Sequence, residues 1–96
     1  MDIKAPEGSP VVTAGDGIVI LTGEDESRGI HVVIQHGASY QTWYTHLHRF
    51  IVKEGDKVKA GSEIGQVGST GYSTGPHLHY EVKKDGVRVN PLDYIE

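Results

Sequence analysis

The sequence predicts an all-β fold, a small antiparallel two-layer β-sandwich of hairpins, on three observations. The chain has 96 residues, which is enough for one hydrophobic core, so we expect a single domain over residues 1–96. It has 13 glycines, and these separate short runs of residues that favour strands. No stretch of the sequence repeats apolar residues at helical spacing.

Seven runs have the composition of β-strands, with β-branched and aromatic residues between glycine-containing turns. They cover residues 11–13, 18–21, 30–36, 40–46, 63–67, 77–83 and 87–89. Gly15-Asp16-Gly17 predicts a hairpin turn that joins the first two runs. Segment 23–29 is polar and acidic, which predicts a solvated loop, and segment 68–76 is rich in glycine and hydroxyl groups, which predicts a second loop that reverses the chain. Asn90-Pro91 ends the last run, because proline cannot donate to a strand ladder.

The composition excludes several classes of protein. The formal net charge is −4 and the lysines and arginines are scattered, whereas nucleic-acid-binding domains usually carry a basic patch. There are no cysteines, which rules out disulfides and thiolate metal sites. No apolar run approaches the roughly 18 residues of a transmembrane helix, and the N-terminus lacks the apolar segment of a signal peptide. We therefore expect no nucleic-acid partner and no transmembrane segment; the oligomeric state stays open.

Six histidines are the most informative feature of the sequence. Four of them form two His-Leu-His patterns, at residues 46–48 and 77–79. Residues i and i+2 of a strand point to the same face, so each pattern predicts two imidazoles aimed one way. In the second pattern, Leu78, Tyr80 and Val82 then form an apolar face opposite His77, His79 and Glu81.

Two strands that present imidazoles, together with a carboxylate, have the chemistry of a catalytic zinc site. Imidazole is the commonest metal ligand and the commonest general base near neutral pH. Zinc at such sites typically takes three protein ligands and keeps one position open for water.

Residues 68–81 (GSTGYSTGPHLHYE) resemble the signature of M23-family metallopeptidases, the lysostaphin/LytM group. Further segments occur in the order of that family, and the similarity covers nearly the whole chain. These segments are residues 2–11 (DIKAPEGSPV), 14–19 (AGDGIV), 33–37 (VIQHG), 42–47 (TWYTHL), 52–61 (VKEGDKVKAG) and 90–91 (NP).

The resemblance implies a LytM-like sandwich with a groove over the central sheet and one zinc ion per domain. Asp2 and His79 occupy the places of two zinc ligands, and His46 and His77 those of the catalytic residues that flank the metal-bound water. Tyr44 and Tyr72 are candidates to line the groove. The implied substrate is the stem or cross-bridge peptide of bacterial peptidoglycan, and the implied location is extracellular, periplasmic, cell-wall associated or phage-borne.

The match departs from the family pattern at its N-terminal end. The first zinc ligand of the family is a histidine four positions before the aspartate, which would fall before Met1. We therefore expect a domain that is N-terminally truncated relative to the family, with zinc bound weakly or not at all and no activity unless a third ligand is recruited. His31, His36 and His48 have no role in the pattern and are expected in packing or at the surface.

Three other hypotheses are open to test. The first is a degenerate, non-catalytic LytM module that binds and regulates a cell-wall protein. The second is a biotinyl- or lipoyl-type carrier domain, which residues 52–67 resemble, although no lysine is placed at a hairpin tip with the expected neighbours. The third is phosphate binding by residues 68–75, which lack a following Gly-Lys-Ser/Thr and are followed by a strand.

Overall fold

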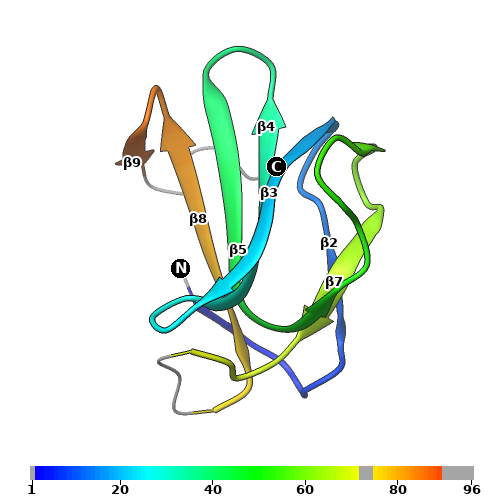
Figure 1. The fold of residues 1–96 in the computed structure, drawn as a ribbon, viewed down its shortest axis with the longest axis vertical. Coiled ribbons are helices and arrows are strands. Elements are labelled where there is room, and N and C mark those ends of the chain that lie inside the picture. Colours follow the sequence, from blue (N-terminus) through cyan, green and yellow to red (C-terminus); the bar gives the residue numbers. More distant parts are fainter. Residues whose placement is uncertain (1, 72–74, 90–96) are drawn as a thin grey trace.

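The computed structural model describes residues 2–71 and 75–89, and every regular element in these ranges is a β-strand (Figure 1). All strand pairs are antiparallel, which confirms the predicted fold class. The described part of the chain contains no helix with the length and apolarity needed to cross a membrane. The strands are β1 (Asp2–Lys4), β2 (Pro10–Val12), β3 (Gly17–Asp25), β4 (Gly29–His36), β5 (Tyr40–Phe50), β6 (Lys57–Val58), β7 (Glu63–Val67), β8 (His77–Lys84) and β9 (Val87–Val89).

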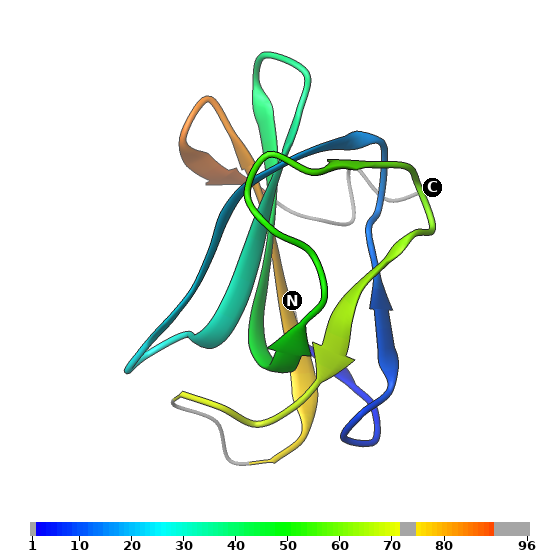
Figure 2. The same cartoon turned by 45° about the vertical axis from the view of Figure 1, so that its right-hand side comes forward.

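The strands form one sheet that curls into two layers (Figure 2). Its main path runs β1-β8-β5-β4-β3-β6, with β9 beside β8. β2 and β7 pair with each other and make the second layer. β5 joins the two layers: residues Tyr40 to Thr45 pair with β8, whereas Leu47 to Phe50 pair with β7.

The hydrophobic core fills the space between the layers. Its largest fully buried side chain is Tyr44, which is 1% exposed and lies with its ring centroid 5.4 Å from that of Tyr80. Tyr44 is therefore a core residue, and the expectation that it lines the groove is wrong; Tyr72 lies outside the described residues. Burial of each core side chain of Val, Leu or Ile size contributes about 1.5–3 kcal/mol. The other core residues are Val11, Val19, Val32, Ile34, Leu47, Val58, Ile64, Val67, Leu78, Tyr80 and Val82.

The hairpin predicted between residues 11–13 and 18–21 is wrong. β2 pairs with β7, where Val11 lies opposite Gly65, and β3 pairs with β4 and β6. The glycines of this segment permit close packing instead of a tight turn. A Cβ atom on Gly17 would lie 2.5 Å from the carbonyl oxygen of Gln35 on the neighbouring strand, which is closer than any side chain tolerates.

The loop predicted for residues 23–29 is shorter than expected. β3 continues through Asp25 and pairs with β4 up to Gly29, so only residues 26–28 form the turn. Asp25 caps this turn, because its Oδ1 accepts hydrogen bonds from the Arg28 backbone N–H at 2.6 Å and from the Ser27 hydroxyl at 3.3 Å. The bond from the Arg28 backbone is also the main reason why the pKa of Asp25 lies below its ordinary value.

Most other strand boundaries agree with the sequence, and the differences lie at the ends. β7 and β9 match the predicted residues, and β8 is one residue longer than expected. β1, of three residues, and β6, of two residues, were not predicted. Asn90-Pro91 lies outside the described residues.

A β-bulge in β5 redirects the chain at His46. Thr45 lies opposite His79 and Leu47 opposite Ile30, whereas His46 between them has a φ of 62°. A bulge adds one residue to a strand and breaks its alternation. Thr45 and His46 consequently line the same cleft, while His48 is exposed and lies outside it. That His46 and His48 point the same way stays a prediction, but only His46 lines the cleft.

Residues 68–71 are held against the 26–28 turn by Thr70 and two glycines. The Thr70 hydroxyl accepts from the Ile30 backbone N–H at 3.0 Å and donates to the Leu47 carbonyl at 2.6 Å. Gly29 and Gly71 meet at this point, both with positive φ. A Cβ on Gly29 would lie 2.4 Å from the Thr70 carbonyl carbon, and one on Gly71 would lie 2.3 Å from the Gly29 nitrogen.

Replacement of Gly29 by alanine should be much more damaging than replacement of Gly37. The two glycines lie at either end of β4 and have nearly the same φ, 65° and 67°, but nothing lies within 4 Å of a Cβ at Gly37. Gly37→Ala should cost roughly 1–2 kcal/mol from its backbone conformation alone. Gly29→Ala should cost roughly 1–3 kcal/mol more through overpacking. Urea unfolding of both variants measures the difference, and equal losses would contradict the close-packing argument.

Glycine should be better than alanine at position 46. In an ordinary strand, glycine destabilises by roughly 0.5–1 kcal/mol relative to alanine. At a φ of 62° the order reverses, because a Cβ atom costs roughly 1–2 kcal/mol in the left-handed region. We expect His46→Gly to have a higher free energy of unfolding than His46→Ala, with both variants lacking the imidazole. The same pair at His48 serves as control, and the same order of stabilities at both positions would argue against strain at His46.

Candidate active site

Three imidazoles converge on one side of the sheet, as the sequence predicted. The ring centroid of His46 on β5 lies 5.1 Å from that of His77 and 6.0 Å from that of His79, both on β8. The alternation along β8 is regular, with Leu78, Tyr80 and Val82 buried in the core. His77 and His79 are therefore on the opposite face, which confirms the two faces predicted for this strand.

His46 and His79 lie in a cleft of about 310 Å³ over β5 and β8. This cleft corresponds to the predicted groove over the central sheet. Its walls combine polar, cationic and aromatic side chains from the 26–28 turn and three strands. The lining residues are Ser27, Arg28, Trp43, Thr45, His46, His79, Glu81, Lys83 and Arg88.

Backbone carbonyls fix the orientation of two of the rings. The Nδ1 of His46 donates to the Thr70 carbonyl oxygen at 2.6 Å, and the Nδ1 of His77 donates to the Gly75 carbonyl oxygen at 2.9 Å. A carbonyl oxygen only accepts, so Nδ1 carries the proton in both rings. In the neutral imidazole the lone pair is then on Nε2, which is the state of a general base.

His79 is oriented through its other nitrogen by a carboxylate. Its Nε2 donates to Oε1 of Glu81 at 2.8 Å, and the same oxygen accepts from the Arg88 guanidinium at 2.6 Å. Burial raises the pKa of Glu81, but the hydrogen bond from His79 and the charge of Arg88 outweigh it, so the pKa lies below its ordinary value. With the proton on Nε2, the lone pair of His79 is on Nδ1. A carboxylate that accepts from a histidine in this way is the usual partner of a metal-binding histidine.

The backbone of Asp2 lies beside this cluster. β1 pairs with β8, and the Cα of Asp2 is directly opposite that of His79. The side chain of Asp2 lies outside the described part of the structure. Among the side chains that are described, no three from His, Asp and Glu are grouped so as to hold a metal ion.

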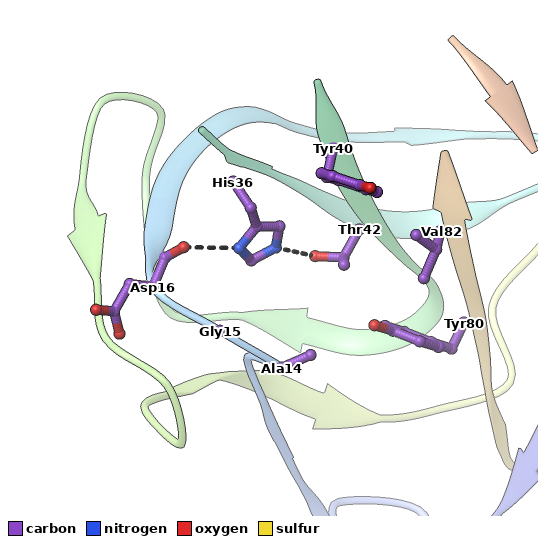
Figure 3. A pocket seen from close by; sticks show the side chains of 8 residues that line it. All are labelled: Ala14, Gly15, Asp16, His36, Tyr40, Thr42, Tyr80 and Val82. Carbon is purple, nitrogen blue, oxygen red and sulfur yellow. Dashed lines mark hydrogen bonds between the residues drawn. The ribbon is translucent and has the colours of Figure 1, made fainter. Parts of the chain in front are cut away.

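The remaining histidines serve packing and the surface. His31 is buried, with its Nδ1 2.9 Å from the Gly29 carbonyl, and His48 is exposed. The Nδ1 of His36 donates to the Asp16 carbonyl oxygen at 2.7 Å, and its Nε2 lies 2.7 Å from the Thr42 hydroxyl (Figure 3). His36 thus ties the segment between β2 and β3 to β5. The hollow beside it shares no residue with the histidine cleft.

Sequence reasoning missed the aromatic and cationic part of the cleft. The Trp43 ring has the Lys83 ammonium 3.9 Å and the Arg28 guanidinium 4.9 Å from its centroid. The signal was present in the alternation of β5. Trp43 lies between Thr42 and Tyr44, which are buried in the interior, and therefore points to the face of the cleft.

Comparison with known proteins agrees with the fold and with the resemblance. The sequence profile of Peptidase family M23 matches residues 1–91. The peptidoglycan DD-endopeptidase ShyA of Vibrio cholerae serotype O1 is 50% identical over 91 residues, which are 95% of this chain and 21% of ShyA. The chain spans only about a fifth to a quarter of the curated relatives that it matches.

Two crystal structures show the same architecture. A zinc-containing peptidase from Vibrio cholerae is 43% identical with a TM-score of 0.90, over 92% of this chain and 27% of that chain. The catalytic domain of the antimicrobial peptidase lysostaphin from Staphylococcus simulans is 33% identical with a TM-score of 0.92, over 97% of this chain and 74% of that chain. The chain belongs to peptidase family M23.

Proposed function

We propose that this chain is a zinc-dependent endopeptidase domain that hydrolyses peptide bonds in the cross-links of bacterial peptidoglycan. The observation that carries the proposal is the convergence of His46, His77 and His79 on one side of the sheet, each ring fixed by a hydrogen bond to a carbonyl or carboxylate oxygen. The similarity to a peptidoglycan DD-endopeptidase and to a zinc-containing peptidase supports it. The proposed place of action is the cell wall or periplasm, where the substrate lies.

Asp2 and His79 are the proposed zinc ligands. An aspartate and a neutral imidazole are suitable donors for this metal, which typically has three protein ligands at a catalytic site. The pairing of β1 with β8 places the two residues opposite each other, and Glu81 holds His79 in the tautomer that a ligand needs. Zinc bound here would polarise the scissile carbonyl and lower the pKa of a water molecule to near neutrality.

His46 and His77 are the proposed catalytic residues. With Nδ1 of each ring donating to a backbone carbonyl, Nε2 can take a proton from the attacking water and pass it to the departing amine. The protonated ring can then donate a hydrogen bond to the oxygen that becomes negative as the amide carbon is attacked. The bulge that carries His46 sets this geometry, because an unbroken strand would place the residue after Thr45 in the core.

Zinc content tests the proposed metal site directly. If a third ligand completes the site, the chain should bind about one zinc ion after dialysis against trace zinc, measured by mass spectrometry of the metal. With Asp2 and His79 alone, it should bind zinc weakly. His79→Ala should abolish binding, whereas His48→Ala, which removes an exposed imidazole outside the cleft, should leave it unchanged. Equal zinc content in the two variants would refute His79 as a ligand.

Products released from purified peptidoglycan test the reaction. An endopeptidase releases new amino groups without new reducing sugar ends. His46→Ala and His77→Ala should each lower the rate roughly 10²–10⁴-fold, the usual contribution of a general acid–base, with His48→Ala as the control. A chain that binds peptidoglycan or a wall protein, but yields no amino groups with zinc present, would instead be the regulatory module.

A further inference from the structure

One end of the cleft is cationic, although the chain as a whole is acidic. The formal net charge of the chain is −4. The cleft, by contrast, is lined by three cations, Arg28, Lys83 and Arg88, and by a single carboxylate, that of Glu81. Glu81 is engaged by both His79 and Arg88. The side chains that line the cleft therefore carry an excess of positive charge, and screening by solvent is reduced in a concave site.

Strand geometry gives the distance from the histidines to this charge. His79, Glu81 and Lys83 alternate along one face of β8, and Arg88 on β9 lies opposite Lys83. At roughly 3.3 Å per residue, Lys83 is about 13 Å along the strand from His79. An extended peptide has the same rise, so this distance corresponds to about four residues of substrate, or fewer with a long side chain.

Two of the cations are held in place by the indole of Trp43. The Lys83 ammonium and the Arg28 guanidinium lie 3.9 Å and 4.9 Å from its ring centroid. Arg28 is also paired with Asp25 through its Nε at 3.3 Å, but a guanidinium has five N–H donors. Among the described residues, no carboxylate lies within ion-pair distance of Lys83. The cations are thus partly positioned before any ligand binds, which reduces the entropy lost on binding.

We propose that Lys83, Arg28 and Arg88 form a subsite for a free carboxylate of the substrate peptide. This proposal rests on the proposed function and extends it to the class of substrate. The chain should prefer cross-links that carry an ionised carboxylate within a few residues of the cleaved amide. A glycine cross-bridge, which has no side-chain carboxylate, and an amidated cross-link should be weaker substrates. Hydrogen bonds to charged groups are stronger than neutral ones, and an arginine can bind a carboxylate through two of them.

A pair of peptides that differ in one group tests the subsite. One is a cross-linked stem-peptide dimer with a free carboxylate up to about four residues from the cross-link, and the other is the same dimer with that carboxylate amidated. Trp43 is the single tryptophan of the chain and lines the cleft, so its fluorescence reports binding without any hydrolysis. The free acid should bind at least about tenfold more tightly than the amide, and the ratio should fall as salt is raised. Equal affinities would overturn the proposal.

Two lysines on β8 provide a matched pair of variants. Lys83→Gln removes a cation from the cleft. Lys84→Gln removes the next lysine in the chain, which does not line the cleft and has its ammonium 5.6 Å from the centroid of the Tyr40 ring. Lys83→Gln should bring the acid-to-amide affinity ratio closer to one, while Lys84→Gln should retain it. A similar fall in both variants would point to overall charge and overturn the subsite.

Hydrolysis of the same two peptides separates the subsite from the proposed function. Tighter binding of the free acid with no cleavage in zinc would support the subsite and refute the endopeptidase. Cleavage of both peptides with equal kcat/KM would refute the subsite and support the endopeptidase. Cleavage with a higher kcat/KM for the free acid supports both.

Discussion

The packing of Thr70 and its flanking glycine against the start of β4 is the constraint on which the site depends. The Thr70 hydroxyl bonds to both β4 and β5, and its carbonyl accepts from His46. Thr70 thus fixes both the bulge in β5 and the orientation of the His46 imidazole. Each of these three hydrogen bonds contributes about 1 kcal/mol net. Together they are a substantial part of a total free energy of unfolding of roughly 5–15 kcal/mol. Stability and the geometry of the site are coupled here, because the same contacts provide both.

The fold class and the strands with regular alternation could be predicted from the sequence, but the pairing of strands could not. β8 shows alternation along its whole length, and its two faces were assigned correctly. Gly15 and Gly17 looked like a hairpin turn, yet the chain crosses between layers there and β2 pairs with β7. Glycine is favoured both in tight turns and where two backbones approach closely. The sequence alone does not distinguish these two uses of glycine.

The candidate site was predictable in its histidines and not in its surroundings. His46, His77 and His79 were identified from two short patterns and a family resemblance, and they do converge. The pattern at residues 46–48 did not reveal the β-bulge, which gives His46 a positive φ and places it beside Thr45 in the cleft. The cationic end of the cleft was missed because Arg28, Lys83 and Arg88 lie on a turn and two strands. They come together only through the pairing of strands, which was not predicted.

The pairing of β1 with β8 has a consequence for when the site comes into existence. Asp2 and His79 are 77 positions apart in the chain and meet only through this pairing. Closing so long a loop is slow and comes after local hairpins such as β3–β4 have formed. During synthesis, β1 leaves the ribosome before β8, the strand with which it pairs. A partly made chain therefore lacks the contact between β1 and β8, and the position of Asp2 opposite His79 is a property of the finished fold.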